Sequence, residues 1–247
     1  DKHVITDFAA EKSYVIFKLA AIFEKEMKEV GVWNLFTTIE MPLTVVLAKI
    51  EIEGIALDVD MLVKYSKKLN EELITQTVLI HELAEQKFNI ASPKQLGEIL
   101  FEKIILTKKP KKTKSGQYST SEETLLKLKD EHPIIDAILT FRAIKKLVST
   151  YVDALPLLVN KDTNRIHTTF NQSVAATGRL SSVNPNLQNI PIRTKRGMKV
   201  REAFIPRDEN YTLMAADYSQ IELRIMASLS KDQGMLTAFN NGVDIHS

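Results

Sequence analysis

The sequence predicts an α+β fold, in which an elongated, mostly helical module gives way to a mixed module near residue 160. Apolar residues recur at helical spacing through the first part, for example over 15–23 and 43–50. In the second part, the short runs 166–170, 203–206 and 212–216 are typical of strands and are separated by stretches rich in Asn, Ser, Pro and Gly. We therefore expect helices first and a small sheet afterwards.

Turn and capping residues set the limits of the expected helices. Gly31 and Gly54 interrupt the apolar pattern, so helices are expected to end there. Asp58 is a suitable cap for the long helix that follows. The apolar side of that helix carries Leu62, Tyr65, Leu69, Leu73 and Leu83.

Three further helices and one loop complete the helical module. A serine followed by a proline at 92–93 begins a helix that is expected to run to about residue 105. Residues 108–119 hold five lysines and a glycine without apolar periodicity, which predicts a mobile loop. Capping-box residues at 120–123 then begin a short helix, and a longer helix is expected over 133–158.

The composition is that of a globular protein without cysteine chemistry. Hydrophobic residues make up 44% and charged residues 26% of the 247 positions, and cysteine is absent. Disulfides and thiolate metal sites are therefore excluded. No apolar run approaches the roughly 20 residues that cross a bilayer, and the first residues lack the layout of a secretory signal. We expect a cytoplasmic protein with no membrane partner.

The net charge of +2 hides an uneven distribution. Residues 1–60 carry 6 Lys and Arg against 11 Asp and Glu, a net of −5, whereas residues 61–247 carry 27 against 20, a net of +7. Basic side chains gather at 108–114 and at 193–201. Such clusters suit a polyanion, because each cation placed on a phosphate releases a condensed counterion. A solvated surface loop is the simpler explanation for either cluster alone.

The strongest short motif is Asp-Tyr-Ser-Gln-Ile-Glu-Leu-Arg at 217–224. A carboxylate at the end of a buried strand, followed at once by a helix over 219–229, is a rigid platform for a divalent ion. Magnesium prefers oxygen ligands, and the carbonyl of Tyr218 is a candidate second ligand. The alternative is that Asp217 merely ends a strand while Ser219 and Glu222 form a capping box. Spacing alone leaves both interpretations open.

A second motif combines Asn, Gln and Arg between turn residues. It begins with Ala-Thr-Gly-Arg-Leu-Ser-Ser at 176–182 and continues with Asn-Pro-Asn-Leu-Gln-Asn-Ile-Pro-Ile-Arg at 184–193. Arg and Gln side chains can donate to the minor-groove acceptors that every correctly paired base pair offers. An Asn- and Pro-rich connecting loop is the alternative.

Together, 177–193 and 217–224 resemble the palm motifs of the family A DNA polymerases. Their order and separation match that family, and 200–206 between them is similar to its connecting strand. The similarity continues upstream through 92–96, 113–120 and 141–151, which resemble thumb elements of the same enzymes. The resemblance covers essentially all 247 residues.

The resemblance implies three parts. Residues 1–30 would be the end of a 3′–5′ exonuclease-like domain, and 31–160 a helical thumb with the helices that connect it to the palm. Residues 161–247 would be the N-terminal part of the palm, up to the start of the fingers. The expected fold is thus a truncated family A polymerase fold with an incomplete antiparallel palm sheet. The remainder of the polymerase chain becomes an expected partner.

The resemblance also implies an enzyme of DNA replication and repair that transfers nucleotides from dNTP to a primer 3′-hydroxyl. Asp217 would be its catalytic carboxylate and, with the Tyr218 carbonyl, would bind Mg²⁺ in a two-ion site. The expected nucleotide-binding residues are Gln220, Ile221, Glu222 and His246. Glu222 would exclude the 2′-hydroxyl of a ribonucleotide. For His246, an exposed or core histidine is the alternative.

Primer–template DNA is the implied macromolecular partner. Arg179 is expected in the minor groove at the primer terminus, and Arg193 near the primer end. The residues expected to follow template and primer are Asn186, Gln188 and Asn189. Those expected to hold the duplex backbone in the thumb, without reading its sequence, are Lys112, Thr113, Ser119, Thr120, Arg142 and Lys146.

Two departures from the family pattern affect these expectations. The second metal-binding carboxylate and the nucleotide-binding fingers residues of these enzymes lie downstream of Ser247. The 247-residue chain alone is therefore expected to bind DNA without polymerising. Phe8 and Lys12 stand where an exonuclease motif would have Tyr and Asp, which implies an inactive exonuclease in the parent protein.

Two other function classes stay open on the sequence. One is a non-catalytic module that binds duplex DNA. The other is a magnesium-dependent nuclease that uses Asp217, Glu222 and Asp244. An extension assay separates them, because a polymerase lengthens a primer, a nuclease shortens it and a binding module leaves it unchanged.

Overall fold

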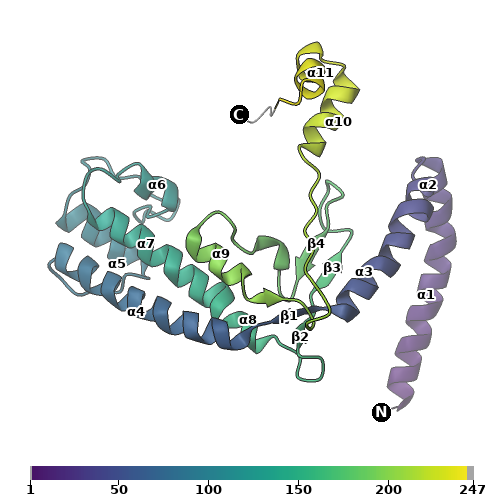
Figure 1. Cartoon of the computed structure of the whole chain (residues 1–247), viewed down its shortest axis with the longest axis horizontal. Helices are drawn as coiled ribbons and strands as arrows, with labels where there is room; N and C mark the ends of the chain where they lie inside the picture. The colour runs from purple at the N-terminus through teal and green to yellow at the C-terminus, as the bar shows by residue number, and fades with distance from the viewer. Residues whose placement is uncertain (1, 244–247) are drawn as a thin grey trace. The chain divides into compact units, whose positions relative to one another are not determined.

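The computed structural model of the chain describes residues 2–243 and has the expected α+β fold (Figure 1). Its contacts divide the chain into two compact units, Asp1–Ile205 and Pro206–Ser247. The first unit contains all the strands of the described residues. No helix within residues 2–243 is long and apolar enough to cross a membrane. His246 and Asp244 lie outside the described residues.

The first unit begins with helices and continues into a long helical arm. The N-terminal segments are α1 (Lys2–Glu29), α2 (Trp33–Leu35), the π-helical turn η1 (Phe36–Glu40) and α3 (Met41–Glu53). The arm contains α4 (Val59–Leu83), α5 (Pro93–Glu98), the π-helical turn η2 (Ile99–Lys103), α6 (Glu122–Leu126), α7 (Ile134–Leu147), the π-helical turn η3 (Val148–Val152) and α8 (Ala154–Leu157).

Local capping begins the helices of the arm at the expected residues. The Asp58 carboxylate accepts a hydrogen bond from the Met61 backbone N–H at 2.8 Å. Ser92 and Ser121 accept in the same way from residues three positions later. Gly54 ends α3 with φ +64°, and a Cβ there would lie 2.6 Å from the carbonyl oxygen of Ile166. These limits confirm the sequence prediction, because caps depend only on neighbouring residues.

Two hydrophobic cores hold the arm together. The first lies where α4 begins and α7 ends, around Leu62, Leu69 and Ile144, and it includes Ile166 and Val200 from later in the chain. The second lies at the other end of the same two helices. It contains Ile80, Leu96, Leu100, Leu125, Ile134 and Ile138. The arm is therefore anchored to the strands through its first core.

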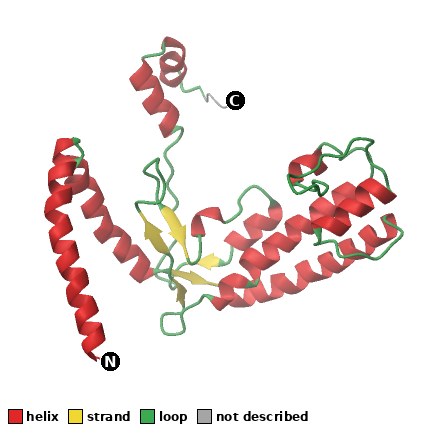
Figure 2. Ribbon diagram, turned by 180° about the vertical axis from the view of Figure 1, so that it is seen from behind, coloured by secondary structure: helices red, strands yellow, loops and turns green. Residues whose placement is uncertain are grey.

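The strands form two small antiparallel sheets (Figure 2). The first has the order β2 (Arg165–Ile166), β1 (Ile55–Leu57), β5 (Phe204–Ile205). The second pairs β3 (Thr169–Asn171) with β4 (Ser181–Val183). The region predicted to be mostly helical contains a strand that was not predicted, β1, which pairs with residues more than a hundred positions later. The strand expected at 203–206 is confirmed by β5, whereas the single strand expected at 166–170 is divided between β2 and β3, which belong to different sheets.

The second unit corrects two local predictions. Residues 212–216 form no strand, because no described strand pairs with them, and a lone strand leaves its backbone hydrogen-bonding groups without a ladder. The helix expected at Ser219 begins later, as α10 (Ile221–Ser230), and is followed by α11 (Gln233–Asn240). Gln220, in a left-handed conformation, is the N-cap residue of α10 and makes no side-chain cap hydrogen bond.

Candidate nucleic-acid interface

A groove of about 840 Å³ in the first unit brings predicted DNA-binding residues together. One wall comes from α6 and α7, and the other from the segment that leads into α9 (Lys195–Arg201). Arg142 and Lys146 lie on the first wall and Asn189 on the second. Because Asn189 is 43 or more positions from the other two in the sequence, only the fold places it along the same groove.

The groove also contains residues that were not predicted as site residues. Lys195 and Arg196 line its second wall, and Tyr151 of η3 lines the groove as well. The two basic residues belong to the cluster at 193–201, so their charge was the available signal. Arg196 donates to the Glu72 carboxylate through Nε at 3.0 Å and Nη2 at 2.8 Å, which fixes α9 to α4. Lys195 is exposed and gives the groove a positive side chain.

The lysine-rich loop 108–119 folds back on itself beside α5. Lys112 and Tyr118 form an isolated antiparallel bridge, and the Ser119 N–H donates to the Lys111 carbonyl at 2.8 Å. The Tyr118 ring stands 5.3 Å from that of Phe101. A Cβ on Gly97 would lie only 2.8 Å from the Tyr118 Cβ, so this close approach requires glycine. The loop leaves the ammonium of Lys112 exposed, 5.2 Å from the Tyr118 ring.

Arg142 ties the end of this loop to α7. Its guanidinium donates to the Thr120 carbonyl oxygen and, at 3.1 Å, to the Thr120 hydroxyl. Partial burial lowers the pKa of Arg142, and the nearby Glu122 carboxylate opposes that shift. Thr120 is itself buried. In this structure Arg142 and Thr120 hold the loop in place; contact of either with DNA stays a prediction.

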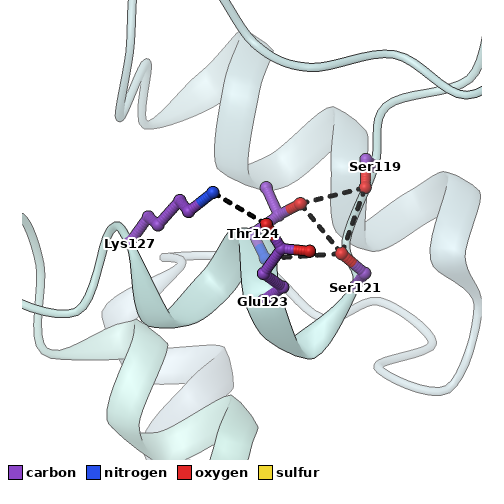
Figure 3. A network of polar contacts seen from close by, with 5 residues as sticks. All are labelled: Ser119, Ser121, Glu123, Thr124 and Lys127. Atoms are coloured by element: carbon purple, nitrogen blue, oxygen red, sulfur yellow. Dashed lines mark hydrogen bonds and ion pairs between the residues drawn. The ribbon is translucent and has the colours of Figure 1, made fainter.

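The hydroxyls after the loop form a hydrogen-bonded network (Figure 3). The Ser119 and Thr124 hydroxyls are 3.0 Å apart, and those of Ser121 and Thr124 are 2.9 Å apart. Lys127 donates to Glu123 at 2.7 Å on the exposed side of α6. Ser119 is buried, whereas Thr113 is exposed and closes the tip of the loop by bonding to Gln117. Ser119 is thus placed as a support of the loop.

The Asn-rich motif forms an exposed turn before the second wall of the groove. Its central residues, the 3₁₀ turn η4 (Leu187–Asn189), are capped by the Asn186 side chain, which accepts from the Gln188 N–H at 3.0 Å. The side chains of Asn186, Gln188 and Asn189 are all exposed. Tyr151 on η3 donates its hydroxyl to the Asn189 carbonyl oxygen. The predicted minor-groove residues are therefore carried by a turn that is held at both ends.

The two predicted arginines of this region lie on connecting segments. Arg179 is exposed in the segment between β3 and β4, next to Gly178 with φ +75°. Arg193 is exposed just before the Thr194 cap of α9. Neither residue lines the groove. Their expected contacts with the primer stay predictions.

The predicted catalytic residue belongs to the second unit. Asp217 is exposed in a segment without regular structure, and Tyr218 beside it is 80% exposed. Gln220 and Ile221 lie at the start of α10, and Glu222 in its first turn. The expected buried platform of a strand ending at Asp217 is therefore not formed within residues 2–243.

The described residues alone do not complete a magnesium site. A carboxylate and a carbonyl are donor types that magnesium prefers. Within residues 2–243, however, no three His, Cys, Asp or Glu side chains are grouped where they could hold a metal ion. Magnesium binding by Asp217 and the Tyr218 carbonyl stays a prediction.

The N-terminal departure from the family pattern lies on α1. Phe8 and Lys12 are four residues apart, which places them on one face of the helix, and the Lys12 ammonium lies 4.4 Å from the centre of the Phe8 ring. Both side chains are exposed. The loss of exonuclease activity that they imply stays a prediction.

Comparison with known proteins decides the family. The model of DNA polymerase family A matches residues 59–247, which is more than half of the chain. This chain belongs to DNA polymerase family A. The expected family is thereby confirmed.

This family A chain is similar to DNA polymerases I of bacteria. It is 46% identical to DNA polymerase I of Bacillus subtilis, over 99% of this chain and 28% of that protein. It is 51% identical to DNA polymerase I of Synechocystis sp., over 94% of this chain and 24% of that protein. The chain therefore spans about a quarter of the length of these relatives.

A solved structure shares the fold. It is the POL domain of Pol1 from M. smegmatis, in a complex with DNA primer-template and dNTP. The TM-score is 0.86 at 43% sequence identity, and the match covers 93% of this chain and 40% of that one.

Proposed function

We propose that this chain is the DNA-holding part of a template-directed DNA polymerase of replication and repair. The groove lined by Arg142, Lys146 and Lys195 carries the proposal, since it combines cations that suit a phosphate backbone. Lys112, which is exposed in the lysine-rich loop, is a further cation of the first unit. A polymerase must hold DNA of any sequence, and backbone contacts of this kind fix position without reading bases. Since the proposed substrate is DNA, the activity would lie in the bacterial cytoplasm, with the nucleoid.

The minor-groove side of the duplex would be followed by Arg179, Asn186, Gln188 and Asn189, with Arg193 near the primer end. Amide and guanidinium donors suit this task, because purine N3 and pyrimidine O2 accept hydrogen bonds at similar places in every matched pair. A mismatch displaces these acceptors. The same residues can therefore make extension depend on correct pairing.

In the reaction, the primer 3′-hydroxyl oxygen attacks the α-phosphorus of dNTP, and pyrophosphate leaves. Asp217, with the Tyr218 carbonyl, would provide part of the magnesium site, and Gln220, Ile221 and Glu222 would face the nucleotide. Bound magnesium supplies charge stabilisation for the triphosphate and lowers the pKa of the attacking hydroxyl. The family membership and the oxygen donors at 217–218 support this assignment.

The isolated 247-residue chain is proposed to bind duplex DNA without extending it. One observation favours this second candidate function, that of a binding module. The described residues contain no group of three or more His, Cys, Asp or Glu side chains that could hold a metal ion.

A primer-extension assay tests both proposals. The polymerase that contains this chain is expected to lengthen a primer on a template with dNTP and Mg²⁺, and the 247-residue chain is expected to leave it unchanged. Lengthening by the short chain would contradict the binding-module proposal. Shortening of the primer by the longer protein, without extension, would replace the polymerase with a nuclease.

A further inference from the structure

Two hydroxyls are buried where β3 meets β4. Thr168 is 6% exposed and Ser182 is 0% exposed, and their oxygen atoms are 2.7 Å apart. Hydroxyls are costly to bury unless they are hydrogen-bonded, and every buried side-chain polar atom within residues 2–243 has a partner. The partners of these two hydroxyls therefore show what the pair stabilises.

All the other partners lie in the backbone at the end of β4 and just after it. The Thr168 hydroxyl contacts the carbonyl oxygens of Val183 at 3.0 Å and Pro185 at 2.9 Å. The Ser182 hydroxyl contacts the Pro185 carbonyl at 3.2 Å and accepts from the Leu187 N–H at 3.1 Å. The β3–β4 ladder ends at Val183, so the backbone after it has no strand partner. The bonds to the two hydroxyls hold that backbone in position instead.

This backbone segment leads into η4, the exposed turn that carries the predicted minor-groove residues. Leu187 and Ile190 pack against the first hydrophobic core, so their neighbours Gln188 and Asn189 project outward. The Tyr151 hydroxyl holds the far end of the turn through the Asn189 carbonyl. A recognition group is effective when its geometry is fixed before the ligand binds. Thr168 and Ser182 supply that fixation from the buried side.

We propose that Thr168 and Ser182 are positioning residues for primer–template recognition, which act by holding the backbone of 183–187 so that Asn186, Gln188 and Asn189 face the duplex. The proposal rests on the proposed function. Neither hydroxyl touches DNA, because both are buried.

The test uses the full polymerase with hydroxyl deletions of matched size. Thr168→Val removes the hydroxyl at nearly constant volume, and Ser182→Ala removes the other. Thr168→Ser keeps the hydroxyl and serves as the conservative rescue. Thr77→Val is the matched control, because the Thr77 hydroxyl bonds only within α4, to the Leu73 carbonyl at 2.7 Å. Each variant is measured for the thermal midpoint, the KM for dNTP and the preference for a matched over a mismatched primer terminus.

We expect Thr168→Val and Ser182→Ala to lower the matched-over-mismatched preference by about tenfold, in line with the loss of a buried hydrogen bond. The KM for dNTP should stay unchanged, and Thr168→Ser and Thr77→Val should behave like the parent. Adding Thr168→Val to Gln188→Ala should cause no further loss of preference, since both changes act through one turn. Should Ser182→Ala not fold, the isosteric Thr168→Val carries the test.

Two results would overturn the inference while leaving the polymerase proposal intact. In the first, Thr168→Val lowers the thermal midpoint but keeps the primer-terminus preference. The Thr168 hydroxyl would then have a purely structural role. In the second, the double variant loses as much primer-terminus preference as Thr168→Val and Gln188→Ala lose together, as free energies. If the parent protein itself fails to extend a matched primer, the proposed function fails and the inference with it.

Discussion

Replacing Asp217 with asparagine in the polymerase that contains this chain is expected to slow primer extension by about a thousandfold, the scale of removing one preorganised electrostatic group from a transition state. Asparagine keeps the size of the side chain and removes the negative charge that would hold a divalent ion. The affinity for primer–template DNA should not change, because the proposed DNA contacts lie in the first unit. Single-turnover extension and a binding titration measure the two quantities.

Asp208→Asn is the matched control for Asp217. Asp208 is an exposed aspartate of the same unit, and its carboxylate accepts from the Asn210 backbone N–H at 2.9 Å, which asparagine can also do. It should extend at the parent rate. An Asp217→Asn polymerase that copies its template at the parent rate would remove Asp217 from the chemistry.

The second large effect is expected at Glu222. Its carboxylate would occupy the space that a ribose 2′-hydroxyl needs, so Glu222→Ala opens that space. We expect the preference for dNTP over rNTP, as a ratio of kcat/KM values, to fall by about a hundredfold. Without a steric block, a pocket discriminates only weakly against a substrate that carries one added hydroxyl. Extension with dNTP should remain. Primer extension with each nucleotide separately provides the ratio.

Glu209→Ala, at another exposed glutamate of the second unit, is the control for this experiment. It should keep the sugar preference of the parent. A Glu222→Ala polymerase with the same preference would leave Glu222 with no role in sugar selection.

Helix limits in this chain could be predicted because they depend on neighbours. Asp58, Ser92 and Ser121 cap their helices through backbone N–H groups three residues away. The strand β1 could not be predicted, because its three residues acquire a ladder only from partners far along the chain. The reverse error occurred at 212–216, where a strand-like pattern has no described partner strand. Pairing, more than propensity, decides short strands.

In the candidate site, too, local features could be predicted from the sequence, whereas features that depend on tertiary contacts could not. The lysines of 108–114 and the motif at 184–193 were visible as charge and composition. The Arg142 bond to the Thr120 carbonyl, the Tyr151 bond to Asn189 and the buried Thr168 hydroxyl were not, since all three depend on tertiary contact. A threonine in a polar stretch gives no sign that it is buried. Sequence therefore indicated the surface that contacts the ligand better than the groups that hold it.

The central claim is that the positive surface of the first unit binds the duplex backbone, and the salt dependence of primer–template binding tests it most directly. Lys112→Gln and the control Lys25→Gln are compared in the polymerase; Lys25 is an exposed lysine on α1 that lies 3.8 Å from Glu29. A lysine that contacts a phosphate contributes about one unit to the slope of log K against log salt. The slope is negative, because salt weakens the binding. We predict that Lys112→Gln makes it less steep by about one unit, while Lys25→Gln leaves it unchanged. Equal slopes for the parent and Lys112→Gln would contradict the account.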